Sequence, residues 1–269
     1  MNMRSHQLCS TWRDELSKWA IPESIIETSK QLPWKLSPKK FAPTEARKTS
    51  LTATRISEFI HQNSEGGINT ILDVGCGAGG LSICFADDIQ CFIGVDESEE
   101  MLAAFRANWA TENLESKNLR TIIGNWPDVA PLAGQADLAI CANVLFNVAD
   151  PCEFITALDR AAKRAVFIEV HENHPHHVAN PVWKHFWGLD RPDSPTARDL
   201  VAIIESLGIS PQSERFFRDP EGPREVDDEL VFSIGQRACI NPGDFDRLRD
   251  FLIENPIRRP EYRLIWWKK

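Results

Sequence analysis

The amino-acid sequence predicts an α/β fold of three layers, in which a seven-stranded, mostly parallel sheet lies between two layers of helices. Strand-like and helical segments alternate through most of the chain, which is typical of this fold class. A glycine-rich turn follows the first strand-like segment, as in many open parallel sheets. The 269 residues, of which 42% are hydrophobic and 26% charged, suffice for one large globular domain with insertions.

Most of the strand-like segments are short and apolar. Helical segments near 79–87, 98–113, 151–163 and 196–207 separate most of them. Such alternation predicts helices on both faces of the sheet. The expected strands are 70–74, 91–95, 120–123, 136–141, 165–170, a segment near 209–217, and 262–267.

Four further segments lie outside this alternation. A helical pattern over 5–30, broken at Pro22, precedes a proline-containing linker at 33–43, and a helical pattern over 44–62 leads into the first strand. Residues 220–256 hold two more helical patterns, at 225–237 and 244–254. The predicted organisation is an N-terminal helical cap, 1–43, and a domain, 44–269, which carries a lid insertion at 171–195 and a helical insertion at 220–256.

Charge and apolar patterning limit the partners. The 30 Lys and Arg against 39 Asp and Glu give a net charge of -9, so no overall positive field favours a nucleic acid. No apolar run approaches the roughly 20 residues that span a bilayer, and the first residues lack a signal-peptide core, so we expect a cytoplasmic protein without membrane contact. The seven cysteines are expected to be reduced. The oligomeric state is not indicated.

The glycine-rich turn indicates a cofactor. Gly75, Gly77 and Gly80 follow Asp73 and open a helix expected near Leu81. Their spacing satisfies the dinucleotide pattern GxGxxG, and the second strand ends in an acid, Asp96, at the place of a ribose-binding carboxylate. A nicotinamide dinucleotide and S-adenosylmethionine therefore compete.

Asp73 distinguishes the two cofactors. Its carboxylate, two residues before the first glycine, would repel a pyrophosphate at a helix N-terminus. S-adenosylmethionine carries a sulfonium and an ammonium against one carboxylate, so a nearby aspartate suits it. The sequence favours S-adenosylmethionine and leaves an NAD(P)-dependent oxidoreductase as an alternative.

Four motifs in order resemble the class I S-adenosylmethionine-dependent methyltransferases. They are ILDVGCGAGG at 71–80, GVDESEEML at 94–102, GNWPDV at 124–129 and ADLAICANVLFNV at 136–148. A less specific similarity, which includes NPVW and GLDRPDSPT, extends to an uncharacterised bacterial subfamily. The resemblance implies a Rossmann-like methyltransferase fold with an antiparallel last strand, and methyl transfer to a small or medium organic acceptor. A non-catalytic protein that binds S-adenosylmethionine is a second alternative.

The resemblance also implies which residues bind the cofactor. Those near its methionine end are Asp73, Gly75, Cys76, Gly77 and Asn143, and those near its ribose and adenine are Asp96, Glu97, Met101, Asn125 and Trp126. For Met101 and Trp126, core packing is the alternative.

The insertion at 171–195 is expected to hold substrate residues. His174 is the candidate general base, since an ordinary histidine titrates near neutral pH. His171, His174 and His177 could form a metal cluster, but Pro175 interrupts their spacing, so no metal is predicted. The candidate substrate pocket comprises Asn147, Trp183, Trp187 and Arg191, with sealing of the lid as the alternative for the tryptophans.

Overall fold

The computed structural model of the chain describes residues 2–29, 37–63, 67–218 and 222–269. Its sheet has the order β3-β2-β1-β4-β5-β7-β6, and β7 runs antiparallel to both of its neighbours. This confirms the predicted seven-stranded, mostly parallel sheet. The strands are β1 (Thr70–Val74), β2 (Cys91–Asp96), β3 (Asn118–Ile123), β4 (Ala136–Ala142), β5 (Ala162–His171), β6 (Gln212–Phe217) and β7 (Glu261–Lys268).

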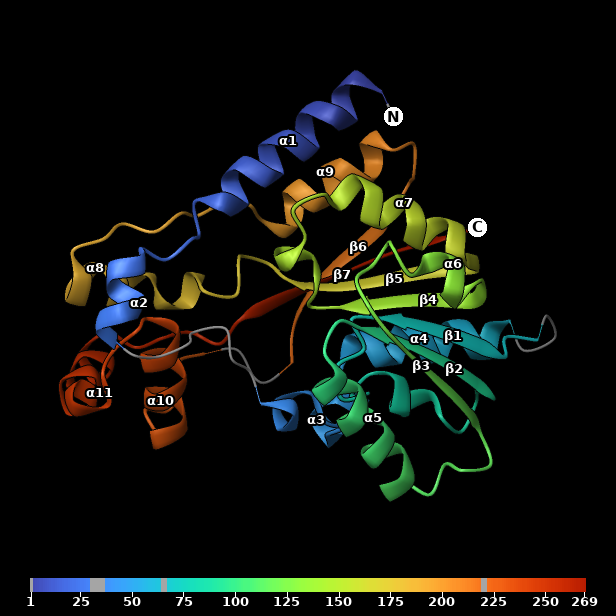
Figure 1. Ribbon diagram of the computed structural model, residues 1–269, viewed down its shortest axis with the longest axis horizontal. Coiled ribbons are helices and arrows are strands. Elements are labelled where there is room, and N and C mark those ends of the chain that lie inside the picture. Colours follow the sequence, from blue (N-terminus) through green and yellow to red (C-terminus); the bar gives the residue numbers. More distant parts are fainter. Residues whose placement is uncertain (1, 30–36, 64–66, 219–221) are drawn as a thin grey trace.

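Helices cover both faces of the sheet (Figure 1). Each layer buries apolar side chains against the strands, and this burial is the main force that holds the layers together. One face carries α6 (Ala130–Ala133), α7 (Pro151–Ala161) and α9 (Ala197–Ser206), with α1 (Met3–Ser17) packed on α7 and α9. The other carries α4 (Leu51–Gln62), the 3₁₀ helix η3 (Ser82–Phe85) and α5 (Glu99–Thr111).

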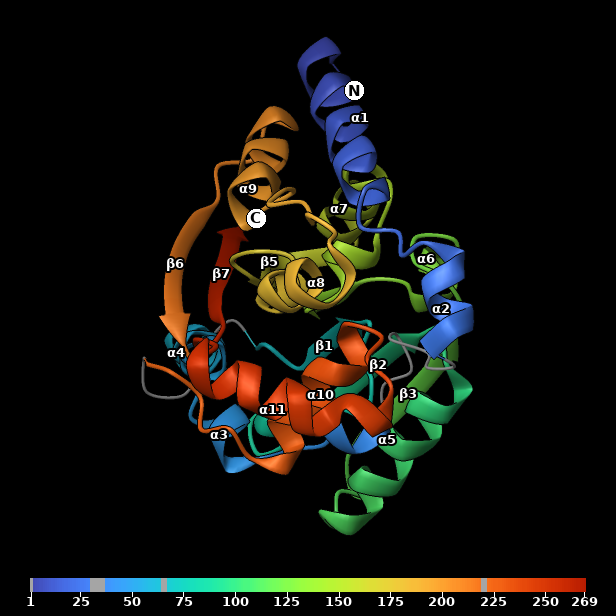
Figure 2. The same cartoon turned by 90° about the vertical axis from the view of Figure 1, so that its left-hand side faces the viewer.

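A second apolar core joins segments that are far apart in the sequence, and we call it the lid cluster. Its buried residues include Ile25, Trp183, Ile234 and Leu248, one from each of four helices. The predicted N-terminal cap is thus divided, since α1 packs on the sheet domain and α2 on the two insertions (Figure 2). The helices of the lid cluster are α2 (Glu23–Ser29), α8 (Asn180–Trp187), α10 (Asp228–Arg237) and α11 (Phe245–Glu254), with the 3₁₀ turns η5 (His177–Ala179) and η6 (Pro242–Asp244).

Two helix predictions need correction. The helix expected at 79–87 is only the short η3, because the glycine turn continues through Gly79, which has a φ of +80°. The helix expected over 44–62 is divided into α3 (Glu45–Lys48) and α4. The hydroxyl of Ser50 accepts a hydrogen bond from the Ala53 N–H at 3.2 Å, so the break is an N-cap of α4. Of the predicted linker, 33–36 lie outside the described residues, and Pro38–Phe41 form the 3₁₀ helix η1.

The prediction that all cysteines are reduced is wrong for one pair. Cys9 of α1 and Cys152 of α7 form a disulfide, with their Cα atoms 6.1 Å apart. The two are separated by 143 positions, so no local spacing could reveal the pair; the packing of α1 on α7 creates it. None of the helices within 2–29, 37–63, 67–218 and 222–269 is long and apolar enough to cross a membrane.

Candidate active site

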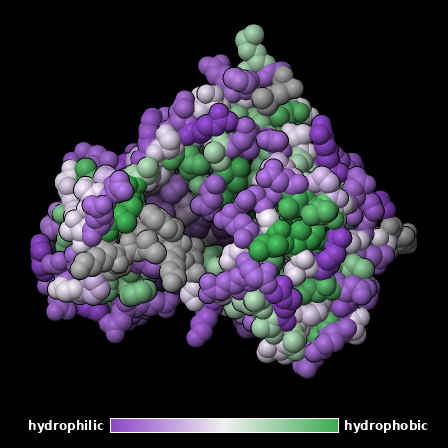
Figure 3. Space-filling model, in the orientation of Figure 1, coloured by the Kyte–Doolittle hydropathy of each residue, from purple (hydrophilic) through white to green (hydrophobic). Residues whose placement is uncertain are grey.

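A cavity of 2630 Å³ opens at the carboxyl ends of the parallel strands. Because β7 is antiparallel, its amino end lies at this same edge of the sheet. The lid cluster faces this edge, and the molecule is hollowed between the sheet edge and the lid cluster (Figure 3). A pocket for one small ligand occupies roughly 300 to 1,000 Å³, so this cavity has room for two. Strand-end residues that line it are Asp73, Asp96, Gly124, Asn143, His171 and Tyr262.

The ten residues predicted to bind the cofactor all line this cavity. The structure therefore brings together side chains and backbone from four strand ends, as the parallel topology requires. They are Asp73, Gly75, Cys76, Gly77, Asp96, Glu97, Met101, Asn125, Trp126 and Asn143. Trp126 also packs into the sheet core, with 9% of its surface exposed, and its Nε1–H donates to the Phe154 carbonyl at 3.2 Å.

The glycine turn is shaped so that a ligand can approach its backbone closely. Gly75 has a φ of +71°, and a Cβ there would lie 2.2 Å from Val144 Cγ2, so only glycine fits. The Gly77 N–H donates to Asp96 Oδ2 at 2.9 Å, and the Ser98 N–H donates to Asp96 Oδ1 at 2.9 Å. These two hydrogen bonds hold the Asp96 carboxylate in place. Since a carboxylate has about four acceptor sites, Asp96 can still accept hydrogen bonds from a ligand.

The segment that contains η1 lies against this turn. A Cβ on Gly77 would lie 3.3 Å from Phe41 Cβ, and one on Gly80 would lie 2.5 Å from the Phe41 carbonyl oxygen. Phe41 and Lys40 both line the cavity. A stretch that was expected to be a linker therefore forms part of the cavity wall.

Asp73 is almost completely buried. Only 2% of its surface is exposed, and its one hydrogen-bonded side-chain partner within the described ranges is Ser82, whose hydroxyl donates to Oδ2 at 2.5 Å. Burial raises the pKa of Asp73 to about 6, although Ser82 and the positive charge of Arg47 oppose the rise. A carboxylate in this state gains much from a cation placed beside it.

Glu169, two residues before the end of β5, forms a buried ion cluster that was missed in the sequence analysis. Its Oε1 accepts from Arg47 Nη1 at 2.7 Å and from Asn143 Nδ2 at 3.0 Å, and Arg218 donates to the same atom. The Thr52 hydroxyl donates to Oε2 at 2.5 Å. Burial opposes ionisation, but the two arginines outweigh it and lower the pKa of Glu169 to about 2. The only signal in the sequence was a charged residue inside a continuous apolar strand.

Asn143 connects this ion cluster with the cavity. It follows β4 with a φ of +60°, and its side-chain N–H group is used by Glu169. Its Oδ1 is buried and has no hydrogen-bond partner among the described residues. Since an unpartnered buried carbonyl is costly, this oxygen is suited to a ligand that donates a hydrogen bond.

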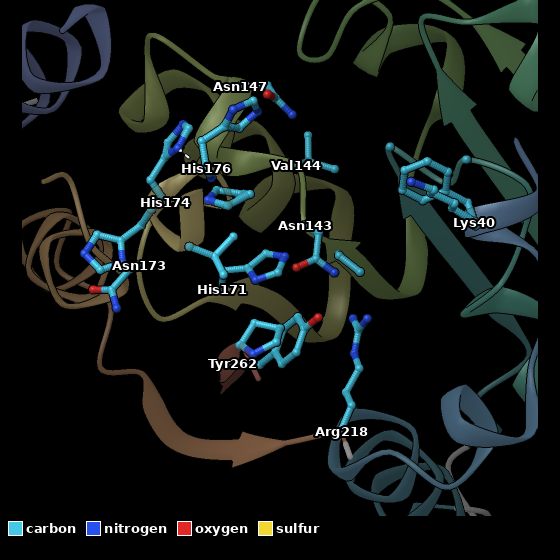
Figure 4. A pocket seen from close by; sticks show the side chains of 18 of the residues that line it. Lys40, Asn143, Val144, Asn147, His171, Asn173, His174, His176, Arg218 and Tyr262 are labelled. Atoms are coloured by element: carbon cyan, nitrogen blue, oxygen red, sulfur yellow. Dashed lines mark hydrogen bonds between the residues drawn. The ribbon is translucent and has the colours of Figure 1, made fainter. Parts of the chain in front are cut away.

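His174, the predicted general base, is a packed side chain with 8% of its surface exposed. Its ring stacks on Trp19 with the centroids 4.0 Å apart, and its Nδ1 accepts from the His176 N–H at 3.2 Å (Figure 4). Burial and neighbouring histidines lower the pKa of His174 to about 2. The sequence prediction rested on the ordinary pKa of histidine and could not include this burial, so His174 is a poor base at neutral pH.

Of the four predicted substrate residues, only Asn147 lines the cavity. The other three stabilise the lid. Trp183 is buried in the lid cluster, and the Trp187 Nε1–H donates to the Ala238 carbonyl at 2.7 Å. The Arg191 guanidinium lies 5.0 Å from the ring centre of Trp183 and donates to the Ala20 carbonyl at 3.0 Å, which ties α8 to the N-terminal segment. Trp183 and Trp187 thus seal the lid, which was the alternative prediction for them. The predicted role of Arg191 in the substrate pocket is not supported.

The histidines of the insertion do not gather around a metal. Within the described ranges, no three His, Cys, Asp or Glu side chains are arranged to hold a metal ion. The His171 ring instead contacts the Tyr262 ring in a tilted arrangement, with the ring centres 4.5 Å apart, and His177 Nε2 lies 3.2 Å from Asp193 Oδ1.

Comparisons with known proteins agree with this geometry. Residues 71–165 match the family described as "Methyltransferase domain". The YcgJ protein of Bacillus subtilis is similar in structure, with a TM-score of 0.51 and 17% identity over 75% of this chain and 92% of its own. A putative methyltransferase from Bacillus halodurans has a TM-score of 0.50 and 14% identity over 78% of this chain and 98% of its own. No curated protein sequence matches the chain significantly.

These findings define the class of protein. At such low identities the two solved structures show the shared fold, and the matched segment contains the glycine turn, Asp96 and Asn143. Residues 71–165 therefore match a methyltransferase domain, and the chain shares the fold of the two solved structures.

Proposed function

We propose that this protein transfers a methyl group from S-adenosylmethionine to a small or medium-sized organic acceptor. The observation that carries the proposal is the single cavity that continues from the glycine turn to the lid cluster. One end offers a buried carboxylate and a shaped backbone, and the other is enclosed by side chains from two insertions. Such a cavity can hold a donor and an acceptor side by side.

The residues at the donor end fit S-adenosylmethionine. In our proposal the Asp73 carboxylate and the orphaned Asn143 Oδ1 face its positively charged methionine end, beside the turn at Gly75 and Gly77. Asp96 would accept hydrogen bonds from the ribose hydroxyls. The contacts with the ribose and adenine would come from Glu97, Met101, Asn125 and Trp126, with Cys76 at the methionine end.

Alignment and exclusion of water are the main catalytic contributions that we assign to the protein. S-adenosylmethionine supplies a methyl group on a positively charged sulfur, which a nucleophile displaces in line. Burial, assisted by arginines, lowers the pKa of His171 to about 3 and of His176 to about 4, so neither is charged at neutral pH. The side chains on this wall are thus suited to hold an acceptor rather than to accept its proton.

Calorimetric titration with S-adenosylmethionine, S-adenosylhomocysteine and NAD tests the proposal. We expect micromolar binding of both adenosyl ligands and a roughly 10- to 150-fold loss in Asp96→Ala, the size of a charge-assisted hydrogen-bond loss. Because Asp96 also anchors Gly77, Asp96→Asn, which keeps the shape, is measured beside it. Glu112→Ala, an exposed position outside the cavity, should bind like the unmodified protein.

The alternatives have distinct outcomes. Binding of NAD alone would indicate an oxidoreductase and refute the proposal. If both adenosyl ligands bind, a panel of hydroxyl, amine and carboxyl compounds is assayed for formation of S-adenosylhomocysteine. Ligand binding without turnover on any of them would favour a non-catalytic protein.

A further inference from the structure

The cavity lining contains more basic side chains than the two paired with Glu169, and three of them interact electrostatically with one another. Lys40 comes from η1, Arg224 from the segment before α10, and Arg237 from the last position of α10. Within the described ranges, no carboxylate oxygen lies within 4.0 Å of any of them. By contrast, Arg47 and Arg218, which line the same cavity, are both paired with Glu169.

Arg237 is the member of this basic group that also acts on the histidines. It is half-buried, and the hydrogen bond that the structure gives it is a long one, from Nη1 to the Pro175 carbonyl at 3.4 Å. A guanidinium has five N–H donors, so most of its hydrogen-bonding capacity is unused. Burial is the main reason for the lowered pKa values of His171 and His176, and Arg237 adds to both. The positive charge of Arg237 is therefore close enough to these two histidines to lower their pKa values.

The three positive charges also repel one another. Burial lowers the pKa of Lys40, and Arg237 and Arg224 lower it further, against a partial compensation by Glu229. Such an arrangement does not stabilise the fold. Mutually repelling cations that converge on an open cavity are the arrangement that an anionic ligand neutralises. The neighbouring histidines are neutral at pH 7 and contribute hydrogen-bonding groups rather than charge.

We propose that the methyl acceptor is an organic carboxylate whose negative charge is held by Lys40, Arg224 and Arg237. The name "acceptor" rests on the proposed function, whereas the anion site itself does not. A molecule held there by its carboxylate would share the cavity with Asn143 and Asn147, which line the same cavity (Figure 4). The basic group then selects for charge, while the rest of the cavity selects for shape.

The test measures binding of carboxylic acids against their own amides. Salicylate and salicylamide, anthranilate and anthranilamide, and benzoate and benzamide are titrated by thermal shift and calorimetry, with the protein alone and saturated with S-adenosylhomocysteine. Inorganic phosphate is titrated in parallel. We expect at least one acid to bind at least 10-fold more tightly than its amide, and Arg237→Gln to weaken that acid by about 10- to 100-fold while leaving the amide unchanged.

Two further variants secure the result. Lys40→Gln changes a side chain that is only partly covered, so the fold should be preserved, and it should weaken the same acid by about 3- to 10-fold. Arg247→Gln removes an exposed arginine of α11 outside the cavity and should change nothing. Four outcomes would overturn the inference. They are equal binding of acids and amides, failure of every acid to bind, acid binding that neither Arg237→Gln nor Lys40→Gln changes, and binding of phosphate alone. Acid binding by a protein that binds no adenosyl ligand would uphold the anion site and refute the proposed function.

Discussion

Replacement of Asp73 by asparagine should stabilise the protein and remove its affinity for the methyl donor. The folded-state pKa of about 6 lies above the ordinary 3.8, so the folded protein holds this proton more tightly than the unfolded chain does. That contribution to stability is fully present below pH 3.8 and is lost as the pH rises through 6. The ionised carboxylate therefore costs about 3 kcal/mol at pH 8 and about half of that at pH 5, at 1.36 kcal/mol for each pH unit.

The neutral amide avoids this cost but makes a weaker hydrogen bond with Ser82, which leaves a net gain of about 2 kcal/mol at pH 8. For a chain of this size the melting temperature should rise by about 5 °C in Asp73→Asn, and by less at pH 5. Differential scanning fluorimetry at both pH values measures this, with the exposed Asp87→Asn as the unchanged control. A melting temperature that falls equally at both pH values would refute the reasoning, because Asp73 would then stabilise the fold as a hydrogen-bonding group.

Two more predictions concern buried groups. Glu169→Gln leaves Arg47 and Arg218 without a counter-charge, so urea unfolding at pH 7 should show a loss of about 3 to 5 kcal/mol, and a loss below about 1 kcal/mol would contradict the ion cluster. The depressed pKa of Glu169 also implies that its contribution is lost as the pH falls from 4.5 toward 2. His174→Phe keeps the stack on Trp19 and should leave methyl transfer within about threefold with an unchanged pH profile, whereas a loss of about 100-fold with intact cofactor binding would restore His174 as a base.

The sheet and the donor end of the cavity could be predicted because their signals are local. The central strands contain apolar runs, and the glycine turn requires backbone conformations that only glycine adopts easily. Once the strands are parallel, their carboxyl ends share an edge, so Asp73, Asp96 and Asn143 come together although they are far apart in the sequence.

The lid could not be predicted in the same way. Its cluster joins residues from three separate segments, and the sequence contains no sign that Ile25 packs with Trp183 and Leu248. The prediction of His174 as a general base failed for the same reason. Its pKa depends on burial and on neighbouring histidines, and folding places these groups and Trp19 beside it. The Cys9–Cys152 bridge is a third case, because it depends on how one helix crosses another.

The antiparallel direction of β7 has a consequence for how the specificity of this protein can change. Phe217, at the end of β6, is paired in register with Glu261, at the start of β7. The chain between them, which includes α10 and α11, thus leaves and re-enters the sheet at adjacent points beside the cavity. Because its two ends are adjacent, the length of this segment does not set the position of either strand. Under the proposed function, a change in the length or the side chains of this segment would alter the acceptor side of the cavity and leave the strands that carry Asp73 and Asp96 in place.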